Sequence, residues 1–312
     1  MSDLIAITGA TGFAGGAVLE ELQARGVALR ALARDPSKLS GVEVVKGDLS
    51  DVGALAALMR GARTCIHIAG AIAAASRTEF FATNETGTRH VAEAAQAAGV
   101  QRLVHISSLA AHQPELGDYG ASKLAGENAA AAFKGTLGII RPPAVYGPGD
   151  TATLPLLQSL MQRIAIIPGR ADGCMSVIYV DDLARIIADA ALASWTGIRE
   201  VSDGKAGGYR WRDLTAAIAE AEGRTITPIH LPRSLADVIA TLRLVPSLTR
   251  PKIAELYFPD WVARDETDPG FTPIPFKEGF ARTAAWYRAR GWLKPGGHTD
   301  RSQRKSTGEA GP

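Results

Sequence analysis

The chain has 312 residues and a formal net charge of +2. This length suffices for one large α/β domain, alone or with a smaller lobe. The small charge gives no reason to expect nucleic acid as a partner, and no apolar run approaches the length of a membrane span.

Strand and helix patterns alternate along the first half of the chain. A short apolar run leads into a glycine-rich turn and then into a helix whose apolar face is formed by Val18, Leu19 and Leu22. We predict further strands at 27–33, 42–46, 64–69, 102–107 and 136–141, and helices at 51–60, 79–98 and 119–133. Such alternation indicates the α/β class, with a doubly wound parallel Rossmann sheet covered by helices on both faces.

The regular alternation ends near Pro142, where proline and glycine become frequent. We predict a dinucleotide-binding Rossmann domain at residues 1–150 and a smaller, mainly substrate-binding lobe at 151–293. The elements expected in this second region are 154–164, 181–194, 211–222 and 277–290, and a few elements are expected to return to the main sheet. Residues 294–312 contain almost no apolar side chain, so we predict a disordered tail.

The cysteines and histidines are scattered rather than clustered. Cys65 and Cys174 lack the spacing of metal ligands or of a disulfide framework, and Cys65 lies in a strand pattern typical of a buried thiol. His67, His105 and His112 are not spaced as metal ligands either, so we predict no metal site. Together with a strand pattern that begins within the first residues, this indicates a cytoplasmic protein without a signal peptide.

The turn after the first strand carries glycine at every third position, as Gly9, Gly12 and Gly15. In such a loop the first glycine permits a sharp turn, the second lets the backbone approach a pyrophosphate, and the third packs the helix against the strand. Free N–H groups at the helix N-terminus would then bind the phosphates, beside Thr11 and Phe13. We predict a dinucleotide site here, with a ligand-free turn as the alternative.

The end of the second predicted strand bears on the choice of cofactor. Arginine at this position accommodates the 2′-phosphate of NADP, whereas a carboxylate binds the ribose hydroxyl of NAD. The chain offers Arg34, with Lys38 nearby, so we favour NADP(H), and Asp35 keeps NAD(H) open. After the third strand, the pair Asp48-Leu49 could contact the adenine, although Asp48 could equally cap a turn.

Candidate catalytic residues follow the fifth predicted strand. Ser107 and Ser108 end that strand, where open α/β sheets bind their ligands. Tyr119 and Lys123 are four residues apart on a predicted helix and would share one face. A neighbouring ammonium group favours the phenolate, so we expect Lys123 to lower the pKa of Tyr119 toward the working range. A serine hydroxyl would hold the substrate carbonyl beside the phenol.

Taken together, these motifs resemble the extended short-chain dehydrogenase/reductase family, also called the NAD-dependent epimerase/dehydratase family. The segments that carry the resemblance are residues 8–15, Asn84, Ser107-Ser108, Tyr119-x-x-x-Lys123, residues 141–149 and residues 179–183. The resemblance implies that Tyr119 is the general acid–base, Lys123 its partner and Ser108, or alternatively Ser107, the carbonyl ligand. It also implies that Asn84 supports the site through water and that Ala69, Gly70, Pro142 and Pro143 line the cofactor, together with Tyr119 and with Lys123, which can hydrogen-bond the nicotinamide ribose.

The spacing between serine and tyrosine is shorter than in sugar-nucleotide epimerases. It resembles a branch near the complex I accessory-subunit-like proteins, which includes bacterial reductases of keto-sphingolipids and ceramides. We therefore favour an NADP(H)-preferring oxidoreductase that reduces a hydrophobic carbonyl compound, such as a keto-sphingolipid or an oxidised ceramide. The alternatives are an NAD-dependent nucleotide-sugar epimerase or dehydratase and a non-catalytic NADP(H)-binding subunit of a larger complex. By analogy with the family, a homodimer is expected.

Two stretches of the second half bear on the substrate. The apolar residues between 154 and 167 could form a wall that suits a lipid or aromatic ketone, or could pack in the core. Residues 231–258 mix apolar and basic side chains, so they could rest on an anionic membrane or simply flank a packed helix. A peripheral location at the inner membrane surface therefore stays open beside the cytoplasmic one.

Overall fold

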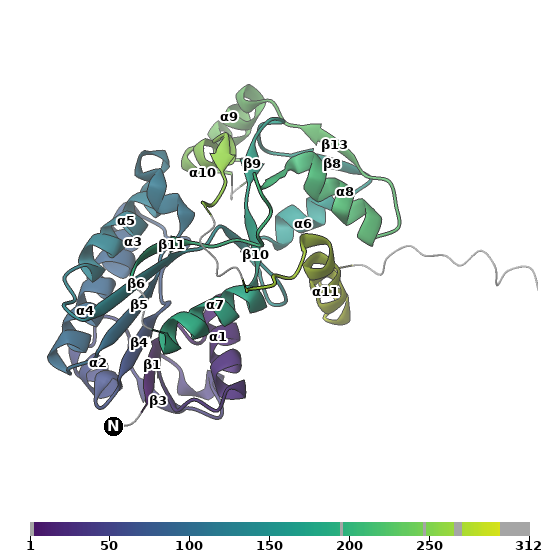
Figure 1. Ribbon diagram of the computed structural model, residues 1–312. Helices are drawn as coiled ribbons and strands as arrows, with labels where there is room; N and C mark the ends of the chain where they lie inside the picture. The colour runs from purple at the N-terminus through teal and green to yellow at the C-terminus, as the bar shows by residue number, and fades with distance from the viewer. Residues whose placement is uncertain (1–2, 194–195, 246–247, 265–269, 294–312) are drawn as a thin grey trace, which may run out of the picture.

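A computed structural model describes residues 3–193, 196–245, 248–264 and 270–293 (Figure 1). The predicted tail at 294–312 lies outside these residues. The main sheet has seven parallel strands in the order β11-β6-β5-β4-β1-β2-β3. These strands are β1 (Ile5–Thr8), β2 (Leu29–Ala33), β3 (Glu43–Lys46), β4 (Thr64–His67), β5 (Arg102–Ile106), β6 (Thr136–Arg141) and β11 (Gly197–Glu200). The predicted doubly wound sheet is confirmed, and its strand order reverses between β1 and β4, where such folds bind nucleotides.

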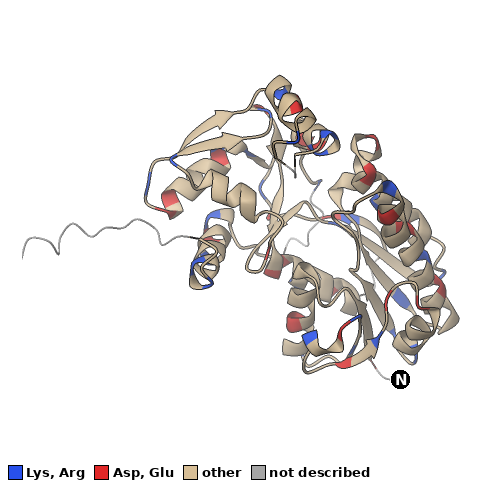
Figure 2. Cartoon of the chain, turned by 180° about the vertical axis from the view of Figure 1, so that it is seen from behind, with Lys and Arg blue, Asp and Glu red and all other residues tan. Residues whose placement is uncertain are grey.

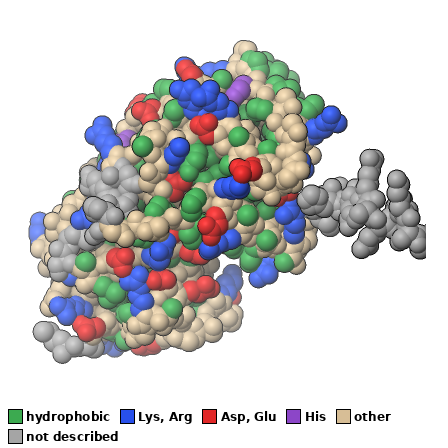
Figure 3. Space-filling view, turned by 45° about the vertical axis from the view of Figure 1, so that its right-hand side comes forward, with side chains coloured by type: hydrophobic (Ala, Val, Ile, Leu, Met, Phe, Trp, Pro, Cys, Tyr) green, Lys and Arg blue, Asp and Glu red, His purple; other side chains and the backbone are tan. Residues whose placement is uncertain are grey.

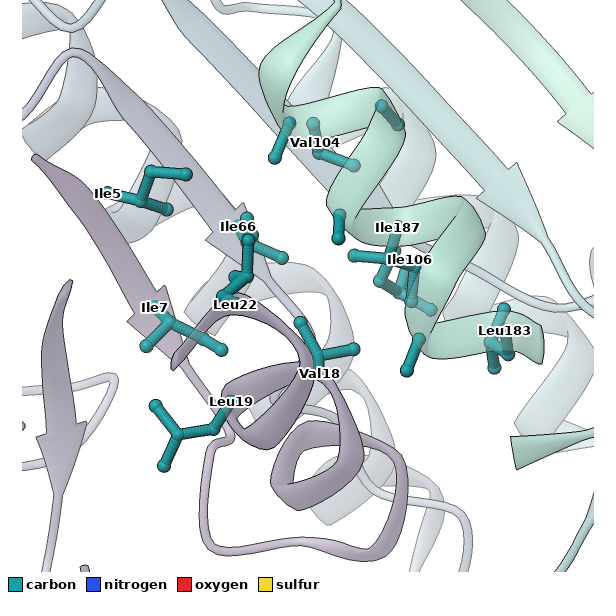
Figure 4. Close-up of a cluster of buried hydrophobic side chains, with 14 of the residues drawn as sticks. Ile5, Ile7, Val18, Leu19, Leu22, Ile66, Val104, Ile106, Leu183 and Ile187 are labelled. Atoms are coloured by element: carbon teal, nitrogen blue, oxygen red, sulfur yellow. The ribbon is translucent and has the colours of Figure 1, made fainter. Parts of the chain in front are cut away.

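Helices cover both faces of this sheet. On one face lie α1 (Phe13–Ala24) and α7 (Val180–Leu192), which pack against each other; on the other lie α2 (Val52–Met59), α4 (Gly87–Ala97) and α5 (Asp118–Ala130). Successive strand residues point to opposite faces, so Ile5 and Ile7 enter the core with α1 and α7, whereas Ala6 and the fully buried Cys65 enter the other core (Figure 4). The central strands are mostly apolar and almost wholly buried, because both of their faces are covered.

The long helix predicted at 79–98 is found as one continuous helical segment over residues 77–97, but it contains a π-helical turn that the sequence did not predict. The structure has a short α3 (Arg77–Phe81), then one π-helical turn (Ala82–Thr86), and then α4. A π turn widens the backbone by one residue and shifts the side chains that follow it. Here it carries Asn84, which is buried. The turn contains weak helix formers (Thr83, Asn84 and Thr86) and is followed by Gly87, but low helix propensity alone does not distinguish a π turn from an α-helical one.

The smaller lobe has its own core, formed around aromatic side chains such as Trp211, Phe276, Phe280 and Tyr287. Its helices are α6 (Leu154–Leu160), α8 (Trp211–Ala221), α9 (Arg233–Thr241), α10 (Arg250–Leu256) and α11 (Phe276–Ala289). Its strands are β7 (Ala144–Tyr146), β8 (Ile164–Ile167), β9 (Cys174–Met175), β10 (Val177–Tyr179), β12 (Tyr209–Arg210), β13 (Thr227–His230) and β14 (Asp260–Trp261). Basic and acidic residues are interspersed over both parts of the molecule (Figure 2).

The apolar stretch between 154 and 167 divides into α6 and β8 rather than forming one element. Leu157, Leu160 and Ile167 are buried in the core of the smaller lobe, whereas Ile164 and Ile166 are exposed. The alternation within β8 explains the difference, since β13 pairs with it and only one face of this two-stranded sheet is covered. This supports the core-packing interpretation of the stretch. Within the described residues, no helix has the length and apolar character needed to cross a bilayer.

Candidate active site

The glycine-rich turn lies at the carboxyl end of β1 and opens α1. Gly9 has a φ of +83°, and a Cβ atom there would lie 2.5 Å from the backbone nitrogen of Ala69. A Cβ atom on Gly15 would lie 2.0 Å from the carbonyl oxygen of Gly9. Only glycine fits both positions, because the chain approaches itself too closely for any side chain. Gly12 is the N-cap of α1 and offers no side-chain acceptor, so no side chain at the cap occupies the N–H groups of the first turn.

This turn fits the pyrophosphate of a dinucleotide. Its N–H groups and the positive end of α1 form a small anion cradle that a side chain would fill. Phe13, the first residue of α1, lies 3.9 Å from the position of a Cβ atom on Gly149 and so borders the turn after β7. Thr11 is exposed in the same loop, and Gly70 follows Ala69 at the end of β4. These glycine-loop and β4 residues therefore meet at the reversal of strand order.

The residues predicted for the adenosine end lie beyond β2 and β3. Arg34 and Lys38 are exposed. The Asp35 carboxylate caps its own turn, since it accepts hydrogen bonds from the Ser37 N–H (3.1 Å) and the Ser37 hydroxyl (2.7 Å), which lower its pKa. Asp35 therefore caps its own turn through one carboxylate oxygen, directly after the exposed Arg34.

Asp48 has the turn-capping role that the sequence left open. Its carboxylate accepts hydrogen bonds from the Ser50 N–H (2.8 Å) and hydroxyl (2.6 Å), and these bonds lower the pKa of Asp48. Leu49 packs against α4, where its Cδ1 atom lies 2.7 Å from the position of a Cβ atom on Gly87. Both residues therefore shape the loop that borders the nucleotide end of the sheet.

The catalytic candidates come together at the carboxyl ends of β4, β5 and β6. Tyr119 and Lys123 lie one turn apart on α5, and the hydroxyl of Tyr119 hydrogen-bonds that of Ser108. Lys123 is buried and donates a hydrogen bond of 2.7 Å to the carbonyl oxygen of Ile106. Its Nζ atom also lies 3.6 Å from the position of a Cβ atom on Gly70, so the ammonium group borders the loop at the end of β4.

The electrostatics of this pair differ from our expectation. Burial raises the pKa of Tyr119, the hydrogen bond from Ser108 lowers it in part, and the Glu255 carboxylate raises it further. Burial lowers the pKa of Lys123 to about 8, against the opposing charge of Glu127. The ammonium group points at the Ile106 carbonyl, so the predicted lowering of the Tyr119 pKa is not observed. Tyr119 is therefore a neutral phenol at neutral pH, the form that can donate a proton.

The two neighbouring serines have different partners. The Ser107 hydroxyl is buried and donates a hydrogen bond to Glu127. The same carboxylate forms a bidentate ion pair with Arg141, with distances of 2.8 Å from Nε and 2.6 Å from Nη2. Ser107 is thus engaged beneath the site, and the geometry favours Ser108 as the carbonyl ligand. The N–H of Leu109 donates to the Pro142 carbonyl (3.0 Å), which ties the Ser108 turn to the Pro142-Pro143 segment.

Asn84 joins the loop after β4 to α5 through direct contacts. Its Oδ1 atom accepts a hydrogen bond from the Ala71 N–H (2.7 Å), and its Nδ2 atom donates to the Ala71 carbonyl (3.0 Å) and the Ser122 hydroxyl (2.9 Å). The support that the family resemblance implied would run through water. The structure shows direct bonds that hold the two segments together next to Gly70 and Lys123, and the role through water stays a prediction.

Sequence reasoning missed the Glu127–Arg141 pair. Glu127 lies four residues after Lys123 and eight after Tyr119, so all three lie on one side of α5. The position of Glu127 four residues after Lys123 could have predicted its role, because a buried lysine needs an opposite charge nearby. The pair also fixes the end of β6 against α5 directly behind Ser107.

Comparison with known proteins identifies the family. The sequence model of the NAD dependent epimerase/dehydratase family matches residues 5–197. The chain belongs to this family. A ceramide reductase from Caulobacter vibrioides is 39% identical over 306 residues, which cover 93% of this chain and 96% of the relative. A 3 beta-hydroxysteroid dehydrogenase/Delta 5-->4-isomerase from Mycobacterium tuberculosis is 31% identical over 212 residues, 57% of each chain.

Solved structures agree on the fold. The UDP-glucose 4-epimerase of Thermus thermophilus in complex with NAD has a TM-score of 0.68 at 21% identity, covering 91% of this chain and 99% of that one. MoeE5 in complex with UDP-glucose and NAD has a TM-score of 0.73 at 22% identity, covering 94% of this chain and all of that one. With the family match, these findings confirm that the chain is an NAD(P)-dependent oxidoreductase of the extended short-chain dehydrogenase/reductase type.

Proposed function

We propose that this family member reduces the ketone of a lipid-like substrate, such as a keto-sphingolipid or an oxidised ceramide, to the alcohol. The observation that carries the substrate class is the 39% identity to a ceramide reductase over nearly the whole of both chains. A ketoreductase of a farnesyl-substituted quinoline oxide from Stigmatella aurantiaca, 32% identical over 48% of this chain, also acts on an isoprenoid-bearing substrate by its name. A sugar diphosphate would need basic side chains to bind its two phosphates. The substrates named for these relatives carry no diphosphate and need no such side chains.

The chemistry follows from two hydroxyl groups and one ammonium group. The reduced nicotinamide supplies the hydride when it is bound. Ser108 donates a hydrogen bond to the substrate carbonyl oxygen, and the neutral Tyr119 phenol donates its proton to the same oxygen as negative charge develops there. Lys123, desolvated below them, stabilises the phenolate that is left. Asn84 and the Glu127–Arg141 ion pair fix the position of α5, which carries Tyr119 and Lys123, relative to the loop after β4 and the ends of β5 and β6.

The function is tested with the purified full chain, NADPH and an N-acyl-3-ketosphinganine in mixed micelles. We expect stoichiometric oxidation of NADPH and formation of the corresponding alcohol, measured by absorbance and mass spectrometry. UDP-glucose with NAD is the parallel substrate, and no epimerised or oxidised sugar is expected. Conversion of the sugar without net consumption of cofactor, and no reduction of the ketone, would instead establish the epimerase alternative.

Arg34 decides the cofactor preference in this proposal. Replacing Arg34 with alanine removes a cation from the 2′-phosphate of NADPH and leaves NADH untouched. We expect the ratio of kcat/KM values for NADPH over NADH to fall by about tenfold or more, the range of a hydrogen bond to a charged group. Arg89→Ala, an exposed arginine on α4 that pairs with Glu85, is the matched control and should leave the ratio unchanged. An Arg34 variant with an unchanged ratio contradicts the preference for NADP(H).

A further inference from the structure

The smaller lobe exposes a stripe of large apolar side chains on α9 and the turn after it. Ala236 is buried against α10, whereas Leu235, Val238 and Leu242 face outward at helical spacing, 47%, 50% and 61% exposed. Leu244 and Val245 continue the stripe at 66% and 44%. We call Leu235, Val238, Leu242, Leu244 and Val245 the outer face of α9. Figure 3 shows hydrophobic side chains on the surface at the upper end of the molecule, where Figure 1 places α9.

Exposed side chains of this size gather here more than elsewhere. Five of the twelve most exposed large hydrophobic residues in the described part of the chain lie within residues 235–245. Single exposed apolar residues are normal, but a contiguous group marks a contact surface. We therefore expect the outer face of α9 to be a contact surface for another molecule or for a membrane.

Positive charge flanks the outer face. Arg233, Arg243 and Arg250 are exposed, and within the described residues no carboxylate forms an ion pair with any of them. Lys252 differs, because it pairs with Glu255 at 2.9 Å. An apolar stripe bordered by unpaired arginines is complementary to an anionic lipid surface, where the stripe enters the acyl boundary and the guanidinium groups bind headgroup phosphates.

The local backbone gives a second reason to assign the arginines a role outside the chain. Arg243 has a φ of +52°. It stands in the Schellman turn that ends α9, where the Arg243 N–H donates to the Ala240 carbonyl and the Leu244 N–H to the Ile239 carbonyl, both at 3.1 Å. Glycine is favoured at this left-handed position, and the apolar residue after it normally packs on the helix. Here Arg243 occupies the left-handed position, and Leu244, the apolar residue after it, is exposed.

The outer face also lies close to the active site. α10 packs against α9 through Ala236, Ile253 and Tyr257. On its other side, Pro251 and Glu255 of α10 lie 3.2 Å and 3.4 Å from the position of a Cβ atom on Gly117, two residues before Tyr119. One helix therefore separates the outer face from the catalytic phenol.

We propose that the outer face of α9 docks onto the surface of an anionic lipid bilayer. Docking places α10, and the neighbouring segment at Gly117 that leads to Tyr119, next to the membrane. A lipid ketone then reaches Ser108 and Tyr119 from the membrane-facing side of the molecule. The docking itself stands without the function proposed above, whereas its use in substrate delivery rests on that function.

Sedimentation with vesicles tests the docking without any substrate. We expect the full chain to bind phosphatidylcholine vesicles containing 40% phosphatidylglycerol about tenfold or more tightly than pure phosphatidylcholine vesicles. Leu242→Ser and Leu244→Ser should each weaken binding severalfold, whereas Val52→Ser, which changes an equally exposed residue beside the main sheet, should not. Equal binding to both vesicles, no binding, or unchanged binding by the leucine variants would overturn the proposal.

Arg243→Gly separates docking from folding. Glycine suits the left-handed turn, so we expect an unchanged or higher melting temperature together with severalfold weaker binding to the anionic vesicles. Light scattering of the free protein tests the rival occupant, because a dimer that Leu242→Ser dissociates would place a second copy on this face instead. Vesicle binding without ketone reduction would refute the proposed function and leave the docking standing.

Discussion

Replacing Tyr119 with phenylalanine is expected to reduce the turnover number for ketone reduction by about three orders of magnitude, the middle of the range for loss of a general acid. Phenylalanine keeps the ring and removes only the hydroxyl that hydrogen-bonds Ser108. The proton that the alkoxide oxygen needs would then have to come from water, which has no fixed position at the site. The measurement is the turnover number with saturating ketone and NADPH, alongside the dissociation constant for NADPH.

The affinity for NADPH should change little in the Tyr119 variant, since the substitution leaves unaltered the glycine loop and the N-terminus of α1, which we expect to bind the phosphates. Tyr257→Phe is the matched control, because it also removes a tyrosine hydroxyl, here one that donates to the Leu231 carbonyl. It should retain near-normal turnover on a ketone that is soluble in water. Turnover of the Tyr119 variant within a factor of about ten of the wild-type value would refute the assigned proton donor.

The sequence predicted the sheet and the cofactor loop because both depend on local rules. Ile5 to Ile7 are apolar on both faces of a strand, which only a covered sheet explains. Gly9 and Gly15 stand where the chain meets itself at distances that exclude any Cβ atom, so the spacing of glycines encodes the geometry. The same holds for Tyr119 and Lys123, whose separation of four residues places them together on a helix.

What the sequence could not predict depends on contacts between distant segments. The π turn that carries Asn84 is explained by its bonds to Ala71 and Ser122, and these residues are far from it in sequence. The sequence does not distinguish the adjacent serines Ser107 and Ser108. In the structure Ser107 hydrogen-bonds Glu127, whereas Ser108 hydrogen-bonds Tyr119. The direction of the Tyr119 pKa was mispredicted for a related reason. Proximity to an ammonium group was inferred from spacing, whereas burial, which dominates, is a property of the whole fold.

Lys123→Met should abolish activity and yet stabilise the fold at neutral pH. Burial lowers the pKa of Lys123 from 10.5 to about 8, so the folded protein holds a charged lysine at neutral pH against a desolvation penalty. Methionine removes that penalty and loses the hydrogen bond to the Ile106 carbonyl. The net gain in unfolding free energy at pH 7 is expected to be about 2 kcal/mol, from the pKa shift less one hydrogen bond.

The pH dependence gives this prediction its sign. Because the pKa of Lys123 is lower in the folded state, the unfolded state binds more protons between about pH 8 and 10.5, and the stability contributed by this group rises with pH across that window. At high pH the wild-type protein therefore regains the unfolding free energy that the buried, charged Lys123 costs it at pH 7. Urea unfolding of both proteins at pH 7 and pH 9.5 should show the stability advantage of the variant shrinking at the higher pH.

Lys134→Met, at an exposed lysine after α5, is the control for the lysine-to-methionine exchange itself and should show no such gain. A Lys123 variant that is less stable at pH 7, or whose advantage is the same at both pH values, would show that the buried ammonium is not held against a penalty. If the predicted pattern is found, a positive charge is kept beneath Tyr119 although the fold is more stable without it. Stabilisation of the developing phenolate is then the physical reason for a lysine at this position.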